Sequence, residues 1–436
     1  MQALLLSILI SIIVFLFIKP KIGIALYLAY FFLVPFLNIN FAGINLQWNL
    51  FNILVILISI NEVSKSGEGK YDLKPFYPFL ILYSFLLFEM IFQTETPYSF
   101  MFDSWRIYIF SLFLPIAIWN IGKSDYKNYI IFKNITIICI IIALGYELFL
   151  TTQPGTNPYV FLLKQINNMD TQEEYAAVVD GRIFGRISSV FAHPMTYGIF
   201  LCLSVVYVFS QFQSTGKRYL ILLILLLVGV LVCGIRSPIA AILVSACYYL
   251  LIKRKIKYFI IAAISGFIIL SIINTIPEIS IAVNSMFTDD TSEISGSSPD
   301  MRLDQLNGCF DEIRNSSIFG KGLGWHTYYM RLHGDHPVIA AFESLLYVVI
   351  CDYGFVGIAI YFFAYFKLFI YIKKKIKNTY SSNIQMLTVI YLAYAIITGD
   401  YGYIRYYLVF YSIMMLDAYY YKLPTINDKK KEKKIK

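Results

Sequence analysis

Residues 219–235 read YLILLILLLVGVLVCGI, an apolar run without a charged side chain. A helix needs roughly 20 apolar residues to cross a bilayer, and this stretch comes close to that length. Comparable runs recur along the chain at 3–18, 22–39, 76–93, 104–121, 129–150, 196–212, 237–252, 258–275, 355–372, 385–399 and 404–420, with a weaker run at 46–60. The pattern predicts an all-α, polytopic integral membrane protein with about 12–14 spanning helices.

The composition agrees with this class. Of the 436 residues, 58% are hydrophobic and only 14% are charged, whereas about 25% are charged in soluble domains. A net charge of +9 would suggest a nucleic-acid partner in a soluble protein, but the lysines form short clusters beside the apolar runs, as at 253–257 and 373–377. Such clusters mark the cytoplasmic side of a membrane, so we expect a lipid bilayer and no nucleic acid as partner. The six scattered cysteines have no CxxC spacing, which predicts neither a zinc site nor a disulfide framework.

The lysine-rich loops also predict the organisation of the chain, because even numbers of apolar runs separate them up to residue 257. The stretch 338–372 is too long for one span, and Gly354 interrupts it, so we expect a rim or re-entrant helix over 338–351 and a span from about 355. The side on which the amino terminus lies stays open. The expected divisions are N-terminal spans in 1–151, a first large outer loop at 152–194, central spans in 195–275, a second large outer loop at 276–354, C-terminal spans in 355–421 and a basic cytoplasmic tail at 422–436.

Histidine and arginine collect on the side opposite the lysines. The outer loops hold all four histidines and several arginines: His193, His326, His333, His336, Arg182, Arg186, Arg302, Arg314 and Arg331. Arg236 lies at the outer end of its apolar run. The planar guanidinium grips phosphate or carboxylate at two points, and a neutral imidazole can take a proton from a hydroxyl. The distribution predicts an anion-handling, proton-transferring site on the outer face.

Each candidate also has a simpler interpretation. Arg182 and Arg186 could pair with acidic residues of their own loop, and His193, before a proline, suits a structural position. The glycine-rich segment 319–326 could let backbone amides approach a phosphate or could be a plain turn.

Arg302 is expected in the first turn of a helix over 300–318, where positive charge opposes the helix dipole. Glu343 lies in an apolar segment and needs a partner, for which an outer-face arginine is expected. His326, His333, Asp335 and His336 could bind a metal but lack a recognised ligand spacing.

Four segments together resemble the O-antigen polymerase and O-antigen ligase superfamily of bacterial membrane glycosyltransferases. They are Arg186–Pro194, Ile235–Pro238, Arg302 with Ser317–Gly324, and His336 through Glu343 to Gly357. Their order and their placement on the outer face carry the resemblance, since each motif alone is loose. Two departures bear on the subtype. Ligases often have His-Asn where this chain has His336-Pro337, and Phe342–Leu346 is closer to repeat-unit polymerases.

The resemblance implies a GT-C-like fold in the bacterial inner (cytoplasmic) membrane, with the active site facing the periplasm or outside. It implies that undecaprenyl-diphosphate-linked repeat units serve as donor and acceptor and are polymerised into O-antigen or capsular polysaccharide. It further implies inverting, metal-independent transfer without a cofactor, and a chain-length regulator protein as a candidate partner. An O-antigen ligase that transfers glycan to lipid A-core is the nearest alternative. A lipid-linked oligosaccharide flippase or exporter is the alternative from another class, disfavoured by the two large outer loops.

The chemistry implied by the resemblance assigns roles to residues. A diphosphate leaving group needs fixed positive partners, and the acceptor hydroxyl needs a base. His336, as the base, and Arg302 and Arg186, on the diphosphate, are the predicted catalytic residues. The predicted substrate-binding residues are Arg182, Arg236, His326, Glu343 and His193, with His326 as the second choice for the base; no metal ligand is assigned.

Overall fold

The computed structural model describes residues 2–34, 39–41, 44–46, 48–65, 71–93, 95–152, 157–167, 186–254, 299–377, 379–400 and 402–421. Several predictions lie outside these residues: the span at 258–275, Arg182 with most of the first outer loop, the first part of the second outer loop, and the basic tail.

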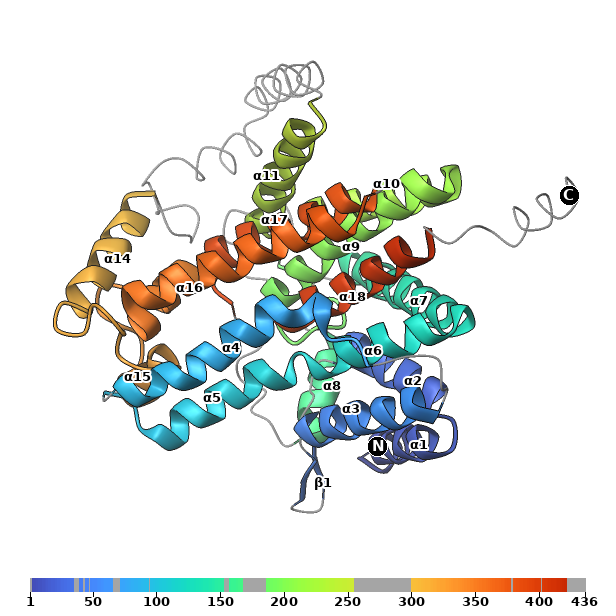
Figure 1. Cartoon of the computed structure of the whole chain (residues 1–436), viewed down its shortest axis with the longest axis horizontal. Coiled ribbons are helices and arrows are strands. Elements are labelled where there is room, and N and C mark those ends of the chain that lie inside the picture. The colour runs from blue at the N-terminus through green and yellow to red at the C-terminus, as the bar shows by residue number, and fades with distance from the viewer. Residues whose placement is uncertain are drawn as a thin grey trace, which may run out of the picture.

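Helices dominate the described part of the chain (Figure 1). They are α1 (Gln2–Ile18), α2 (Pro20–Leu33), α3 (Trp48–Lys65), α4 (Tyr77–Glu89), α5 (Tyr98–Phe110), α6 (Phe113–Ser124), α7 (Tyr126–Thr151), α8 (Pro158–Ile166), α9 (Pro194–Thr215), α10 (Leu220–Val232), α11 (Arg236–Ile252), α14 (Pro299–Glu312), α15 (Trp325–His333), α16 (Leu345–Lys375), α17 (Tyr380–Thr398) and α18 (Ile404–Tyr421), with short 3-10 turns at Lys74–Phe76, Met90–Phe92 and Lys217–Tyr219. The described strands, β1 (Ile39–Phe41) and β2 (Ile44–Leu46), form one antiparallel hairpin in which Asn40 lies opposite Asn45.

Six helical segments in the described part are long and apolar enough to cross a membrane: Lys74–Phe92, Tyr98–Ser124, Tyr126–Thr151, Pro194–Thr215, Leu345–Lys375 and Tyr380–Thr398. Shorter apolar helices cover Leu6–Ile18, Pro20–Leu33 and Arg236–Ile252. Large apolar side chains such as Phe362 (72% exposed) and Ile221 (69%) point outward from the bundle. A bilayer provides the apolar surroundings that such side chains require. The prediction of an all-α polytopic membrane protein is confirmed, and the total number of spans stays a prediction.

The described helices of the predicted second outer loop, α14 and α15, lie at one end of α16. Helices α4 and α16 pack against each other, α5 packs against α4, and both α14 and α15 pack against α16. Figure 1 shows α14 and α15 beside the amino-terminal end of α16. The helix predicted over 300–318 is present as α14, but it ends at Glu312, so its predicted start is confirmed and its predicted end at 318 is wrong. This arrangement places the described part of the predicted second outer loop against α16.

The rim helix predicted at 338–351 begins later than expected, at Leu345. The backbones of His336 and Ala340 pair in both directions, with N–O distances of 3.1 and 2.9 Å. Ala340 and Phe342 have φ of 54° and 52°, a left-handed conformation that an α-helix of L-residues cannot continue. The predicted interruption at Gly354 is confirmed, since its φ of 62° and ψ of −156° kink α16. The amides of Phe355 and Val356, just beyond the kink, donate to the carbonyls of Ser317 and Ile318 at 2.9 and 3.1 Å.

A buried ionic cluster joins three of the helices. The Lys133 ammonium of α7 lies 3.5 Å from the Asp417 carboxylate of α18 and donates to Gln211 of α9 at 2.5 Å. The Tyr129 hydroxyl and the Gln211 amide donate to the same carboxylate at 2.5 and 2.7 Å. Side-chain exposure is 10% for Lys133 and 0% for Asp417. Because a buried charge without a partner is costly, this cluster ties α7, α9 and α18 together.

The predicted topology can be tested with two introduced cysteines. Asn315 is exposed beyond α14, and Lys374 is exposed at the opposite end of α16. Five of the six native cysteines are buried and Cys247 is half-buried, so native labelling should be low. We expect a membrane-impermeant maleimide to label Asn315→Cys in intact cells and to label Lys374→Cys only after lysis, because lysine clusters face the cytoplasm. The reverse pattern would invert the predicted orientation.

Candidate functional site

The glycine-rich segment 319–326 forms a tight turn against α16. Gly320, Gly322 and Gly324 have φ of 66°, 128° and 78°, values that favour glycine. A Cβ on Gly320 would lie 2.5 Å from the backbone of Asp352. The side chain of Gln93 holds the turn, since its amide donates to the carbonyls of Phe319 and Asp352 and its oxygen accepts from the Leu323 amide.

Every backbone amide from Gly320 to His326 donates within the protein. The acceptors are Ser316 O, Cys351 O, Asp352 O, Gln93 Oε1, Asp352 Oδ2, Gly322 O and Asp352 Oδ1 in chain order. A phosphate would need some of these amides to be available. Of the two interpretations left open by the sequence, the structure therefore supports the plain turn.

His326 follows the turn and is held by a carboxylate that the sequence analysis missed. Its Nδ1 lies 2.8 Å from Asp352 Oδ2, and its Nε2 lies 2.9 Å from the exposed Thr327 hydroxyl. The Asp352 side chain is fully buried. It accepts from the amides of Gly324 and His326 at 2.9 and 3.0 Å as well as from the ring. Asp352 therefore fixes both the turn and the orientation of the imidazole.

His336 lies in a different environment. Its Nδ1 accepts from the amides of Val338 and Ile339 at 3.2 and 3.0 Å. Its Nε2 lies 3.3 Å from Glu312 Oε2, and the side chain is only 7% exposed. Both ring nitrogens therefore have partners within the protein. The ring also lies 5.1 Å from that of Tyr329 and 5.9 Å from that of Phe342, measured between centroids.

Glu312 belongs to a cluster of charged side chains that includes Lys321 of the turn. Lys321 contacts Glu312 at 2.5 Å and Glu95 at 3.1 Å, and its ammonium lies 4.9 Å from the centre of the Trp325 ring. Partial burial alone would raise the pKa of Glu312, but Lys321 and His336 outweigh burial and hold that pKa below its usual range. The carboxylate thus stays charged at neutral pH, and the cluster joins α14, the turn and the segment before α5.

Arg302 and Glu343 form the ion pair expected from the sequence. Arg302 Nη2 lies 3.5 Å from Glu343 Oε2, and Nη1 donates to the Glu343 carbonyl at 2.7 Å. The Tyr347 hydroxyl donates to the Arg302 carbonyl at 2.8 Å. The Arg302 side chain keeps 28% of its surface exposed. Arg302 is therefore held at two points by one residue, and its side chain stays partly exposed.

A second group of candidates lies where the first outer loop enters α9. His193 caps α9 by accepting from the Met195 amide at 3.1 Å. Burial first, and the charge of Arg186 second, lower the pKa of His193 to about 4, so the ring is neutral at physiological pH. Burial first, and the charge of Arg186 second, lower the pKa of Arg236. Two neighbouring guanidiniums create a positive potential that an anion would neutralise.

The structure brings several predicted residues together. The rings of His326 and His336 both lie about Phe342, at centroid distances of 6.0 and 5.9 Å, and Phe342 directly precedes Glu343, the partner of Arg302. Arg186, Arg236 and His193 make up the second group. Within the described ranges, no three His, Cys, Asp or Glu side chains are placed to hold a metal ion. Arg182 lies outside those ranges.

A sequence signal existed for one of the missed residues. Asp352 is a lone carboxylate in an apolar run. The same feature identified Glu343, so Asp352 could have been found in the same way. Glu312 carried no comparable signal, because its partners Lys321 and His336 come from a turn and a bridge that no periodicity predicts.

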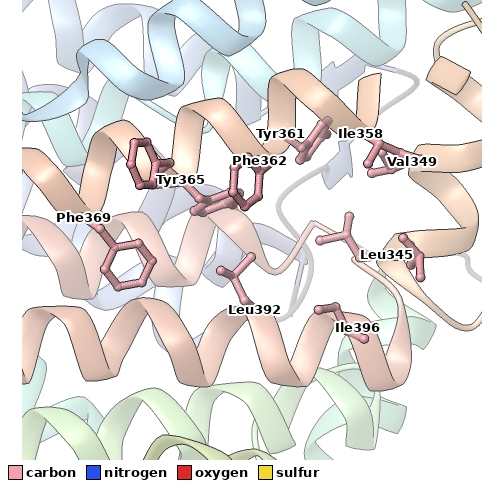
Figure 2. Close-up of a pocket in the computed structure, with 11 residues that line it drawn as sticks. Leu345, Val349, Ile358, Tyr361, Phe362, Tyr365, Phe369, Leu392 and Ile396 are labelled. Carbon is pink, nitrogen blue, oxygen red and sulfur yellow. The ribbon is translucent and has the colours of Figure 1, made fainter. Parts of the chain in front are cut away.

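An apolar cavity of about 390 Å³ lies between α16 and α17. Figure 2 shows Leu345 and Ile396 toward one end and Phe369 at the other, with Tyr361 and Tyr365 along the α16 side. Leu345 follows Glu343 by two residues, so this end of the cavity begins next to the Arg302 ion pair. A cationic site and an apolar cavity are therefore adjacent.

Comparison with known families finds a match that covers part of this region. Residues 221–362 match a family described as O-antigen ligase. The matched segment contains Arg236, Arg302, His326, His336 and Glu343. No curated protein matches the chain. Over residues 221–362, the chain is therefore similar to the O-antigen ligase family, which supports the resemblance found in the sequence.

Proposed function

We propose that the protein transfers glycan from a lipid diphosphate donor to a sugar hydroxyl, as a repeat-unit polymerase at the outer face of the bacterial inner membrane. The observation that carries the proposal is the partly exposed side chain of Arg302 beside an apolar cavity. A lipid diphosphate joins an anion to a long apolar chain. Arg302 can bind the anion, and the cavity can hold the apolar chain. Undecaprenyl diphosphate is the carrier implied by the family resemblance.

The reaction makes one bond and breaks one. The acceptor hydroxyl oxygen attacks the anomeric carbon, the bond from that carbon to the phosphate oxygen breaks, and the lipid diphosphate leaves with the electron pair. A base takes the hydroxyl proton. Arg302, with Arg186 and Arg236 as further candidates, would stabilise the charge that grows on the diphosphate. Attack opposite the leaving group inverts the anomeric centre, and the chemistry assigns no step to a metal or cofactor.

An O-antigen ligase remains the second candidate, because the matched family carries that description. It would use the same donor but pass the glycan to lipid A-core. The chain itself favours the polymerase through Phe342–Leu346, which resembles repeat-unit polymerases. A flippase would move the lipid-linked glycan without changing it. These functions differ in their products and can be separated in one assay.

The test uses the full-length protein in proteoliposomes with lipid-linked repeat units extracted from cells that lack its gene. We expect a ladder of lipid-linked glycans longer than one unit, because the same molecule serves as donor and acceptor. Transfer only when lipid A-core is added would identify a ligase instead. Unchanged repeat units in both reactions, from a monodisperse preparation of the protein, would contradict glycosyl transfer. Empty liposomes are the control.

A further inference from the structure

The hydrogen bonds of His326 define which nitrogen can accept a proton. Asp352 accepts from two backbone amides and lies 2.8 Å from Nδ1 of the ring. A carboxylate accepts hydrogen bonds, so the Nδ1 proton points to Asp352, and the Nε2 lone pair is left to an exposed side-chain hydroxyl instead of a backbone amide. The Thr327 hydroxyl, 2.9 Å from Nε2 and exposed, marks the direction from which another hydroxyl can reach this atom. The neutral ring therefore presents a proton acceptor toward the outside.

His336 has the opposite arrangement. Two backbone amides donate to its Nδ1, so the proton of the neutral ring is on Nε2, which faces Glu312. Its lone pair is used inside the protein, and its N–H is directed at a carboxylate. The side chain is 7% exposed, compared with 18% for His326. To act as a base, His336 would first have to give up the hydrogen bonds that hold its own loop.

We infer that His326 is the general base of the proposed transfer and that Asp352 is its positioning residue. This inference rests on the proposed function and moves the base from His336, the first choice from the sequence, to His326, the second choice. The acceptor O–H proton moves to His326 Nε2 as the oxygen bonds to the anomeric carbon and the lipid diphosphate departs. The proton then passes from the imidazolium to water. Asp352 keeps the required tautomer and stabilises the positive ring.

The position of the base relative to the cation agrees with this assignment. The His326 ring contacts Phe342, and the next residue, Glu343, holds Arg302. The nucleophile and the leaving group of a displacement lie on opposite sides of one carbon, so their protein partners must be neighbours. His326 and Arg302 satisfy this requirement, because their partners Phe342 and Glu343 are consecutive residues.

The test compares variants in the proteoliposome assay, with rates normalised to monodisperse protein. We expect His326→Gln to lower kcat by about 10²–10⁴-fold with little change in KM, since a general base contributes that much. The decrease in rate at low pH, which protonation of the base causes, should be absent from His326→Gln. His333→Ala, an exposed histidine at the other end of α15, should retain the wild-type rate. A loss of less than tenfold for His326→Gln would overturn the assignment.

Asp352 needs separate variants because it also supports the turn. Asp352→Asn should lower kcat and move the acidic limb to lower pH, because an amide no longer stabilises the protonated ring. Asp352→Glu, which keeps the carboxylate, should recover part of kcat. A purely structural role would give equal losses of folded protein for both and unchanged pH profiles in what remains, which would refute the positioning role.

His336→Gln separates this inference from its rival. We expect it to lower the thermal unfolding midpoint while kcat per folded molecule falls less than tenfold. The reverse ranking, with His336→Gln inactive and His326→Gln active, would return the base to His336 and leave the proposed function intact. An inactive wild-type protein would instead refute the proposed function itself. The two failures are thus distinguishable.

Discussion

Arg302→Lys is expected to stop polysaccharide extension almost as completely as Arg302→Ala. The guanidinium reaches the Glu343 carbonyl with one nitrogen and its carboxylate with another, and a diphosphate would be gripped by the same planar fork. An ammonium is a point charge and cannot make two parallel contacts. Loss of one such contact to a developing anion typically costs about 10²–10³-fold in rate. We expect both variants to leave single repeat units on the lipid carrier.

The measurement is the polysaccharide ladder of complemented deletion cells, read beside an immunoblot. Arg314→Lys is the matched control, because Arg314 lies just after α14, the helix that contains Arg302, and forms an exposed pair with Asp311 at 3.0 Å. It should give the wild-type ladder. Normal ladders from Arg302→Lys would show that any positive charge suffices and would assign Arg302 a structural role through Glu343.

Breaking the buried ionic cluster should produce the largest loss of stability. Lys133→Met leaves the Asp417 carboxylate buried without its cation, and removing one partner of a buried pair costs about 3–5 kcal/mol. Lys133→Met combined with Asp417→Asn should recover most of that loss, because no uncompensated charge remains. The thermal unfolding midpoint in detergent measures both effects.

The exposed pair of Arg314 and Asp311 provides the comparison for the same measurement. These side chains are 79% and 72% exposed, and exposed pairs contribute roughly 0–1 kcal/mol. Arg314→Met should therefore leave the unfolding midpoint almost unchanged. Equal losses for Lys133→Met and for the double variant would mean that the cluster acts through packing and not through charge.

The sequence was sufficient for features that depend on local hydrophobicity. Apolar runs predicted the helices, since a bilayer requires long apolar segments whatever their neighbours. Glu343 was expected to have an arginine partner because a carboxylate in an apolar run is costly. The interruption at Gly354 could also be anticipated, because this glycine divides a run too long for one span.

Features that depend on distant contacts or on unusual backbone could not be predicted. The delayed start of α16 follows from left-handed conformations at Ala340 and Phe342, residue types that rarely adopt them. The partners of Lys133 come from α9 and α18, and no sequence spacing relates them. The distinction between His326 and His336 depends on which ring nitrogen meets a carboxylate, and composition carries no information about that.

Gln93 has a consequence for protein engineering. This side chain, contributed by the first hundred residues, makes three hydrogen bonds to the turn and to α16. The family match spans 221–362 and excludes it. A chimera that transplants only the matched segment into a relative would lose this brace unless the recipient supplies an amide at the same place. Exchanges of acceptor specificity between relatives should therefore move Gln93 together with the turn that it holds.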